Sequence, residues 1–224
     1  MKTIVKSSFH TSYELASHHN ENLMQELHFM DKYSIRDDES GLVIGYCEDI
    51  IGFLDYYASR EKHFHEITLS GLRFDEAFVQ HCKSARLKIF GMHFSILGQG
   101  GEPMGSYYFT PEKPISFYND ITSQEKITMS VSGALHGGPS SEALEIWKQW
   151  IIAKPVMKNI WASLSKEQRL GWLEVVRIHS QVAQKKVIED QHYYLDMAYV
   201  TDRISFYCAL GEAMNGRADI TGLT

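Results

Sequence analysis

Apolar and polar residues alternate along much of the chain between residue 42 and about residue 135. The period of two is clearest in residues 127–132, and such alternation is typical of a strand with one buried face. Residues 87–97 are apolar on both faces, which predicts a single central strand covered on both sides. Two short apolar runs, residues 42–46 and 50–54, are expected to form strands that pair with each other. This part of the chain is therefore predicted to be mostly strand.

The spacing of apolar residues becomes helical after residue 140. Ser141 is expected to cap a first helix, and a longer helix is predicted to begin at Ser165. Gln168, three residues after Ser165, completes the pattern of a capping box. A further helical spacing occupies residues 14–33. The apolar stripes comprise Leu144, Trp147, Trp150 and Ile151 in the first helix, and Leu164, Trp172, Val175, Val176, His179 and Val182 in the second.

The order of these elements predicts an α+β fold, because strands and helices are segregated along the chain. Residues 1–138 are expected to form a β-rich domain with a mixed N-terminal segment. Residues 139–190 are expected to form a helical segment packed on that domain, and residues 191–224 form a last β-α unit.

The last unit reads as one strand followed by one helix. Alternation in residues 193–199 predicts the strand, and Thr201 or Asp202 is placed to cap the helix. Asn215 and Gly216 supply a left-handed stop for that helix. Its buried stripe is expected to consist of Ile204, Tyr207, Cys208, Gly211 and Met214.

The sequence of this unit resembles the opening strand and helix of the barstar family of ribonuclease inhibitors. The resemblance rests on the Leu195-Asp196 strand, the Val200-Thr201-Asp202 cap, and the run Ser-Phe-Tyr-Cys-Ala-Leu-Gly-Glu-Ala-Met-Asn-Gly at residues 205–216. In one branch of that family a Pro-Gly-Gly-Tyr loop and an Asn-Leu-Asp-Ala-Leu helix follow and carry the inhibitory contacts. Residues 217–224 match neither motif, so the unit is expected to be a remnant truncated before the inhibitory motif. No inhibitory residue carries over from the family.

The resemblance implies a role, because barstar-like domains commonly act as immunity proteins in competition between bacteria. We therefore expect a cytoplasmic immunity protein, not an enzyme, that neutralises a bacterial toxin by stoichiometric occlusion. The toxin is expected to be a basic ribonuclease. The activity would rest with the body of the chain in residues 1–190, since the inhibitory motif is missing.

Composition and charge agree with a binding protein of this kind. The chain has 224 residues and a formal net charge of −6, which argues against nucleic acid as a direct partner and suits a basic protein partner. No signal peptide, membrane span or cofactor motif is visible in the sequence. The three cysteines, Cys47, Cys82 and Cys208, are odd in number and contain no Cys-x-x-Cys pair, which favours reduced thiols in the cytosol.

Acidic residues and tyrosines gather in one stretch of the sequence, as an inhibitor of a basic nuclease requires. A solvated surface without a partner is the alternative interpretation. The candidate partner-binding residues are Asp37, Asp38, Glu39, Glu48, Asp49, Asp55, Tyr56 and Tyr57.

Two histidines offer a second hypothesis, a small metal-dependent hydrolase. His63 and His65 lie two residues apart on one face of an expected strand, a spacing that can ligate zinc or copper. A third ligand would come from His81, Cys82 or His93. The alternative is a strand with ordinary histidines, and our prediction is that no metal or other cofactor is bound. A structural subunit with no toxin partner is the third possibility.

Overall fold

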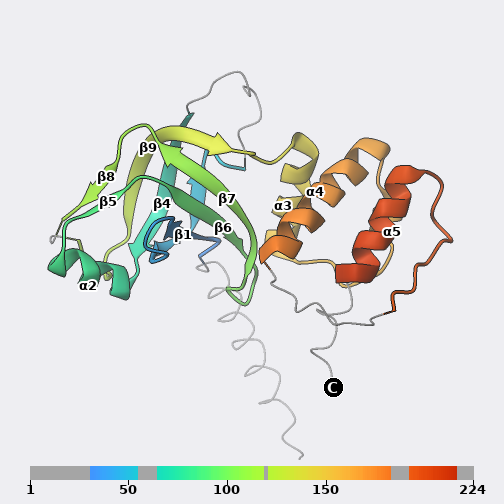
Figure 1. The fold of residues 1–224 in the computed structure, drawn as a ribbon, viewed down its shortest axis with the longest axis horizontal. Coiled ribbons are helices and arrows are strands. Elements are labelled where there is room, and N and C mark those ends of the chain that lie inside the picture. The colour runs from blue at the N-terminus through green and yellow to red at the C-terminus, as the bar shows by residue number, and fades with distance from the viewer. Residues whose placement is uncertain (1–30, 55–64, 119–120, 183–191, 216–224) are drawn as a thin grey trace, which may run out of the picture. The chain divides into compact units, whose positions relative to one another are not determined.

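Antiparallel strands form the main sheet of the protein, as the computed structural model shows (Figure 1). The structure describes residues 31–54, 65–118, 121–182 and 192–215, which belong to one compact unit that begins at Asp31. Within these residues the seven strands lie in the order β2 (Val43–Cys47), β1 (Tyr33–Asp37), β6 (Met92–Leu97), β7 (Pro103–Pro111), β9 (Ile127–His136), β4 (His65–Phe74) and β3 (Asp49–Ile51). Helices follow this strand-rich part, so the α+β prediction is confirmed at that level.

The sheet closes on itself, because β2 pairs with β4 as well as with β1. The closing pairs are Gly45 with Phe74 and Tyr46 with Arg73. A side chain at Gly45 would collide with the carbonyl oxygen of Arg73, so only glycine permits this approach. The result is a barrel-like sheet with an enclosed interior.

The prediction that residues 50–54 pair with residues 42–46 is wrong. Strand β3 pairs with β4 instead, with Ile50 opposite Leu69. The neighbours of β2 are β1 and β4, and both of its edges are therefore occupied. Apolar content alone predicted these two strands, but it does not specify which strands become neighbours.

The single strand predicted over residues 87–97 is two strands. Strand β5 (Leu87–Ile89) pairs with β8 (Ile115–Phe117) in a separate two-stranded sheet, and β6 belongs to the main sheet. The chain breaks at Phe90, which is half exposed, and at Gly91. A side chain at Gly91 would collide with the hydroxyl end of the Tyr108 side chain, which comes from β7.

A helix within the strand-rich region was not predicted. Helix α2 spans Glu76–Ser84, and the side chain of Asp75 caps it by accepting hydrogen bonds from the backbone amides of Ala77 and Phe78. Phe78 packs against Phe117 of β8 at a ring distance of 5.2 Å. The capping aspartate and the helical spacing of Phe78, Val79 and Cys82 were the signals for it.

Both predicted helices after residue 140 are present. Helix α3 spans Ser141–Ile152 and α4 spans Lys166–Val182, with a short 3-10 helix, η1 (Ile160–Ser163), between them. Ser140, one residue before the predicted cap, caps α3 by accepting from the backbone amide of Ala143. The predicted capping box is confirmed: the Ser165 amide donates to Gln168 Oε1 at 2.9 Å, and the Gln168 amide donates to Ser165 Oγ at 3.2 Å.

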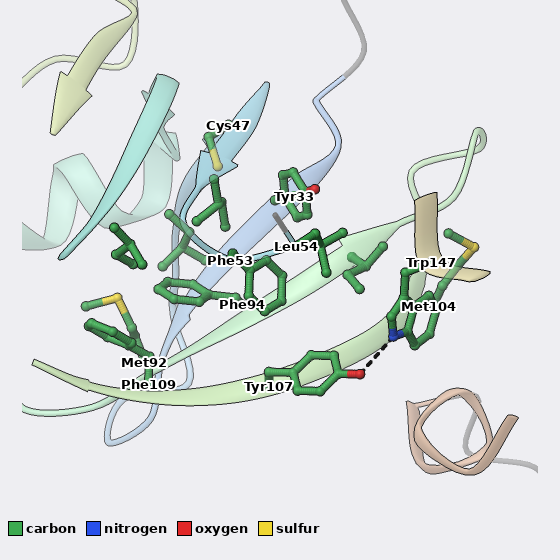
Figure 2. Close-up of a cluster of buried hydrophobic side chains, with 14 of the residues drawn as sticks. Tyr33, Cys47, Phe53, Leu54, Met92, Phe94, Met104, Tyr107, Phe109 and Trp147 are labelled. Atoms are coloured by element: carbon green, nitrogen blue, oxygen red, sulfur yellow. Dashed lines mark hydrogen bonds between the residues drawn. The ribbon is translucent and has the colours of Figure 1, made fainter. Parts of the chain in front are cut away.

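Aromatic side chains fill the interior of the sheet (Figure 2). Phe53 lies at their centre, edge-on to Tyr33, Phe94 and Tyr107 at ring distances of 5.6–5.8 Å. At the rim of the core, the indole Nε1 of Trp147 donates to the hydroxyl of Tyr107 at 2.8 Å. This bond joins α3 to β7, so the helices and the sheet share one hydrophobic core.

The last unit differs from its prediction in two respects. Helix α5 (Arg203–Asn215) is present, but residues 192–200 contain no strand, and Tyr194 is 82% exposed. No described strand lies beside this segment to satisfy its backbone groups, and an isolated strand is not stable.

The buried face of α5 also differs from the predicted stripe. Ser205, Cys208 and Ala209 are buried, whereas Tyr207 and Met214 are exposed. The apolar residues of this helix are spread around its circumference, so their spacing does not define one face.

Asp202, one of the two predicted caps, precedes α5 and caps its N-terminus. Asp202 Oδ1 accepts from the Ser205 amide at 2.7 Å, and Ser205 Oγ accepts from the Asp202 amide at 2.9 Å. This reciprocal pair satisfies two amides that the first turn would otherwise leave without a partner.

Candidate functional site

The acidic residues that adjoin in the sequence lie at the two ends of strand β2. Asp37 is the last residue of β1, and Asp38 and Glu39 belong to the turn between β1 and β2. Glu48 and Asp49, the first residue of β3, follow the opposite end of β2. A strand of this length spans about 16 Å at roughly 3.3 Å per residue. The described residues therefore form two separate acidic sites. Asp55, Tyr56 and Tyr57 lie outside the described residues.

Asp37 stabilises the turn and does not present its charge to solvent. Its side chain is buried, and its Oδ2 accepts from the Ser40 amide at 2.8 Å and from the Ser40 hydroxyl at 2.5 Å. Gly41 completes the turn with a φ of 70°, a conformation that favours glycine. Asp38 and Glu39 are the exposed carboxylates of this turn.

Asp38 joins a row of side chains on the outer face of the sheet. Its Oδ1 lies 2.9 Å from Nε2 of His93. Arg36, His93, Tyr108 and His136 lie opposite one another on β1, β6, β7 and β9, and we call these four residues the outer row. The ring of Tyr108 lies 5.1 Å from that of His93 and 5.4 Å from that of His136.

Sequence reasoning did not find this row. Its signal was the alternation of His93 and Tyr108 with buried Phe94 and Phe109, which places the first pair on the outer face. The register of the strands, which brings Asp38 to His93 across 55 residues of sequence, has no such signal.

The second acidic site, at the other end of β2, is partly neutralised. Glu48 forms an ion pair with Lys126 at 2.5 Å, and both side chains are partly exposed. Asp49 is exposed, and its Oδ1 accepts from the adjacent Ile50 amide. Exposed pairs of this kind contribute little to stability, typically below about 1 kcal/mol. Asp49 is therefore the carboxylate that this site presents to solvent.

The residues proposed for a metal site do not come together. His63 lies outside the described residues, and His65 begins β4 opposite Gly133 of β9. His81 and Cys82 lie on α2, and His93 is bonded to Asp38. Among the described residues no three histidine, cysteine, aspartate or glutamate side chains are grouped as a metal ion would require.

The three cysteines are buried and unpaired. Burial raises the pKa of Cys47 and of Cys82. Burial also raises the pKa of Cys208, to about 11, although the positive charge of Arg169 acts in the opposite direction. A raised pKa keeps these thiols protonated at neutral pH, and the protonated thiol is a poor nucleophile.

We predict that the folded protein resists alkylation by iodoacetamide at pH 8, where all three thiols are protonated and shielded. In denaturant the same treatment should add three carbamidomethyl groups, one for each of the three cysteines. Intact mass spectrometry measures both states. Rapid modification of one cysteine in the folded protein would show that this thiol is activated.

Helix α5 is held to the body of the protein by Glu212. The two carboxylate oxygens of Glu212 accept from the Asn159 amide at 2.9 and 3.0 Å, and Oε2 also accepts from the indole Nε1 of Trp161 at 2.6 Å. Asn159 adopts the left-handed conformation, with a φ of 60°, and precedes η1. The C-terminal helix is therefore an integral part of the packed helices, and Cys208 is buried at its centre.

No helix within the described residues has the length and apolar content needed to cross a membrane. Comparisons with protein-family models, with curated proteins and with solved structures found no match for this chain.

Proposed function

We propose that this chain is an immunity protein that binds a bacterial toxin, expected to be a basic ribonuclease, and occludes its active site. It would act in the cytoplasm as a stoichiometric, non-enzymatic inhibitor. The observation that carries the proposal is the exposed acidic turn of Asp38 and Glu39, which continues into the aromatic and imidazole side chains of the outer row.

The chemistry of this surface suits a nuclease. A nuclease active site binds phosphate groups and is therefore cationic, so it attracts carboxylates of a competing protein. Tyrosine and arginine side chains, both present in the outer row, are over-represented among the residues that dominate binding energy. The sequence of residues 193–216 resembles barstar-type inhibitors, although the structure has the helix of this unit and not the strand; the resemblance supports the same partner class.

Asp38 is held in place before any partner arrives. Its side chain remains 47% exposed although it is bonded to His93, whose side chain is 25% exposed. A carboxylate that is already oriented loses less conformational entropy on binding than a mobile one. This arrangement supports Asp38 as the main contact of the proposed surface.

The two acidic sites provide a matched test of the proposal. The variant Asp38→Lys with Glu39→Lys should lower affinity for the toxin at least 30-fold, because replacing a carboxylate at a buried interfacial pair typically costs about 2–5 kcal/mol. The variant Glu48→Lys with Asp49→Lys, which makes the same change of net charge at the other end of β2, should change affinity less than 3-fold.

We expect a toxin gene immediately upstream of this one. Calorimetric titration with the C-terminal domain of that toxin measures both affinities, and circular dichroism checks that each variant folds. If the variant of Asp38 and Glu39 loses no more affinity than the control at the other end of β2, the acidic turn is not a specific contact of the interface. Wild-type protein that shows no binding to this domain would contradict the proposed function.

A further inference from the structure

A groove of about 300 Å³ runs between helices α3 and α4, far along the chain from both acidic sites. Its volume lies at the lower end of the range of ligand-binding sites. Helix α3 contributes Ser141, Glu142, Glu145, Ile146 and Gln149, and the opposite wall consists of Ile160, Leu164, Gln168 and Trp172.

The two helices are in close contact beside the groove. A side chain at Gly171 of α4 would lie 2.5 Å from the backbone carbon of Glu142, so α3 and α4 meet there without an intervening side chain. Beside this point, Trp172 is nine-tenths buried and lies edge-on to Trp150 at a ring distance of 5.7 Å. The groove therefore has an aromatic wall that packing holds in place.

The charge of the groove is negative. Glu142 and Glu145 line it, and no lysine or arginine is among the lining residues. Glu167 adds a third carboxylate nearby. Its pKa is lowered by its own backbone amide, by the Ser165 hydroxyl and by the charge of Lys166, and the charge of Glu142 opposes that shift. Oε1 of Glu145 lies 3.0 Å from Nζ of Lys148, and both side chains are exposed. Exposed ion pairs are weak, so a cation from a partner can replace Lys148.

The lining of the groove combines apolar and polar side chains. Ile146, Leu164 and Trp172 supply apolar contact area, while the carboxylates and the amides of Gln149 and Gln168 supply polar groups. The indole Nε1 of Trp172 is buried and has no acceptor among the described residues.

We propose that this groove binds a lysine or arginine side chain of the basic partner protein, an inference that rests on the proposed function. Such a side chain has a long apolar stem and a cationic head. The stem would lie on Leu164, Ile146 and the exposed edge of Trp172, and the head would be paired with Glu142 and Glu145. The toxin is then held by two surfaces, the acidic turn and the helical groove.

A peptide titration tests the groove without the toxin. Acetyl-Gly-Arg-Gly-amide should shift the NMR signal of the Trp172 indole, which is assigned by its loss in Trp172→Phe, and the matched citrulline peptide should not. The double variant Glu142→Gln with Glu145→Gln should weaken the arginine peptide at least 5-fold. An arginine peptide that binds this variant as well as wild type would overturn the proposal.

A second titration separates this inference from the proposed function. Glu112→Gln with Glu125→Gln removes the same charge from two exposed glutamates outside the groove and serves as the control. Against the toxin domain, the groove variant should lose at least 10-fold in affinity and the control less than 3-fold. Wild-type binding with equal effects of both variants would contradict the groove alone, whereas absent wild-type binding would contradict the proposed function.

Discussion

Trp147→Ala is expected to lower the free energy of unfolding by about 3–5 kcal/mol, the usual range for removing a buried tryptophan. Trp147 is fully buried at the junction of α3 and the sheet. A side chain at Gly105 of β7 would lie only 2.6 Å from the ring of Trp147, so the indole packs directly on the strand backbone. The alanine variant leaves a cavity there and also removes the donor to Tyr107.

Urea unfolding followed by circular dichroism measures this change, and two milder variants separate its causes. Trp147→Phe keeps most of the ring but leaves the buried Tyr107 hydroxyl without its donor, a loss of about 1–3 kcal/mol. Tyr107→Phe instead leaves the indole without an acceptor and should cost a similar amount. A Trp147→Ala variant within 1 kcal/mol of wild type would show that the helices and the sheet are not joined through this side chain.

Glu212→Ala is expected to release helix α5 from the body of the protein. The substitution leaves the Asn159 amide and the Trp161 indole without their shared acceptor. Hydrogen bonds to a charged group contribute about 1.5–3 kcal/mol each, so the local free energy of opening should fall by at least 2 kcal/mol. Since 1.4 kcal/mol corresponds to a factor of ten, amide protection in residues 203–215 should fall about 30-fold or more.

Hydrogen exchange followed by mass spectrometry measures the loss of protection segment by segment. Strands β6 and β7 should keep their protection, because α5 packs mainly on α4 and η1. Glu212→Gln, which keeps one acceptor oxygen, should have an intermediate effect, and the exposed Met214→Ala should have almost none. Unchanged exchange in Glu212→Ala would show that other contacts hold the helix.

Much of the local structure could be predicted from the sequence, because it depends on neighbouring residues. The alternation in residues 127–132 predicted part of β9, and the pair of Ser165 and Gln168 predicted the first turn of α4. Capping and alternation are local interactions, so their signals lie within a few residues of each other. Helix α2 had such signals as well, but the strands on either side of it obscured them.

The candidate site could be predicted only in part. The exposed carboxylates of Asp38 and Glu39 were among the predicted partner-binding residues, and their role in binding stays a prediction. The separation of Asp49 from them could have been predicted, because a strand was expected over residues 42–46 and the acidic residues flank its opposite ends. Asp37 could not be recognised as a buried turn residue, since its burial depends on the pairing of β1 with β6.

By itself, the sequence determined the α+β composition of the chain, the capping box of α4 and the net charge of −6, and it narrowed the cap of α5 to Thr201 or Asp202. Only the tertiary structure decided the closure of the sheet through Gly45, the outer row from Arg36 to His136, and the groove beside Trp172. The physical reason is that each of these features joins residues far apart in the chain. Their positions follow from strand register and helix packing, which are fixed by the whole core and not by any single segment.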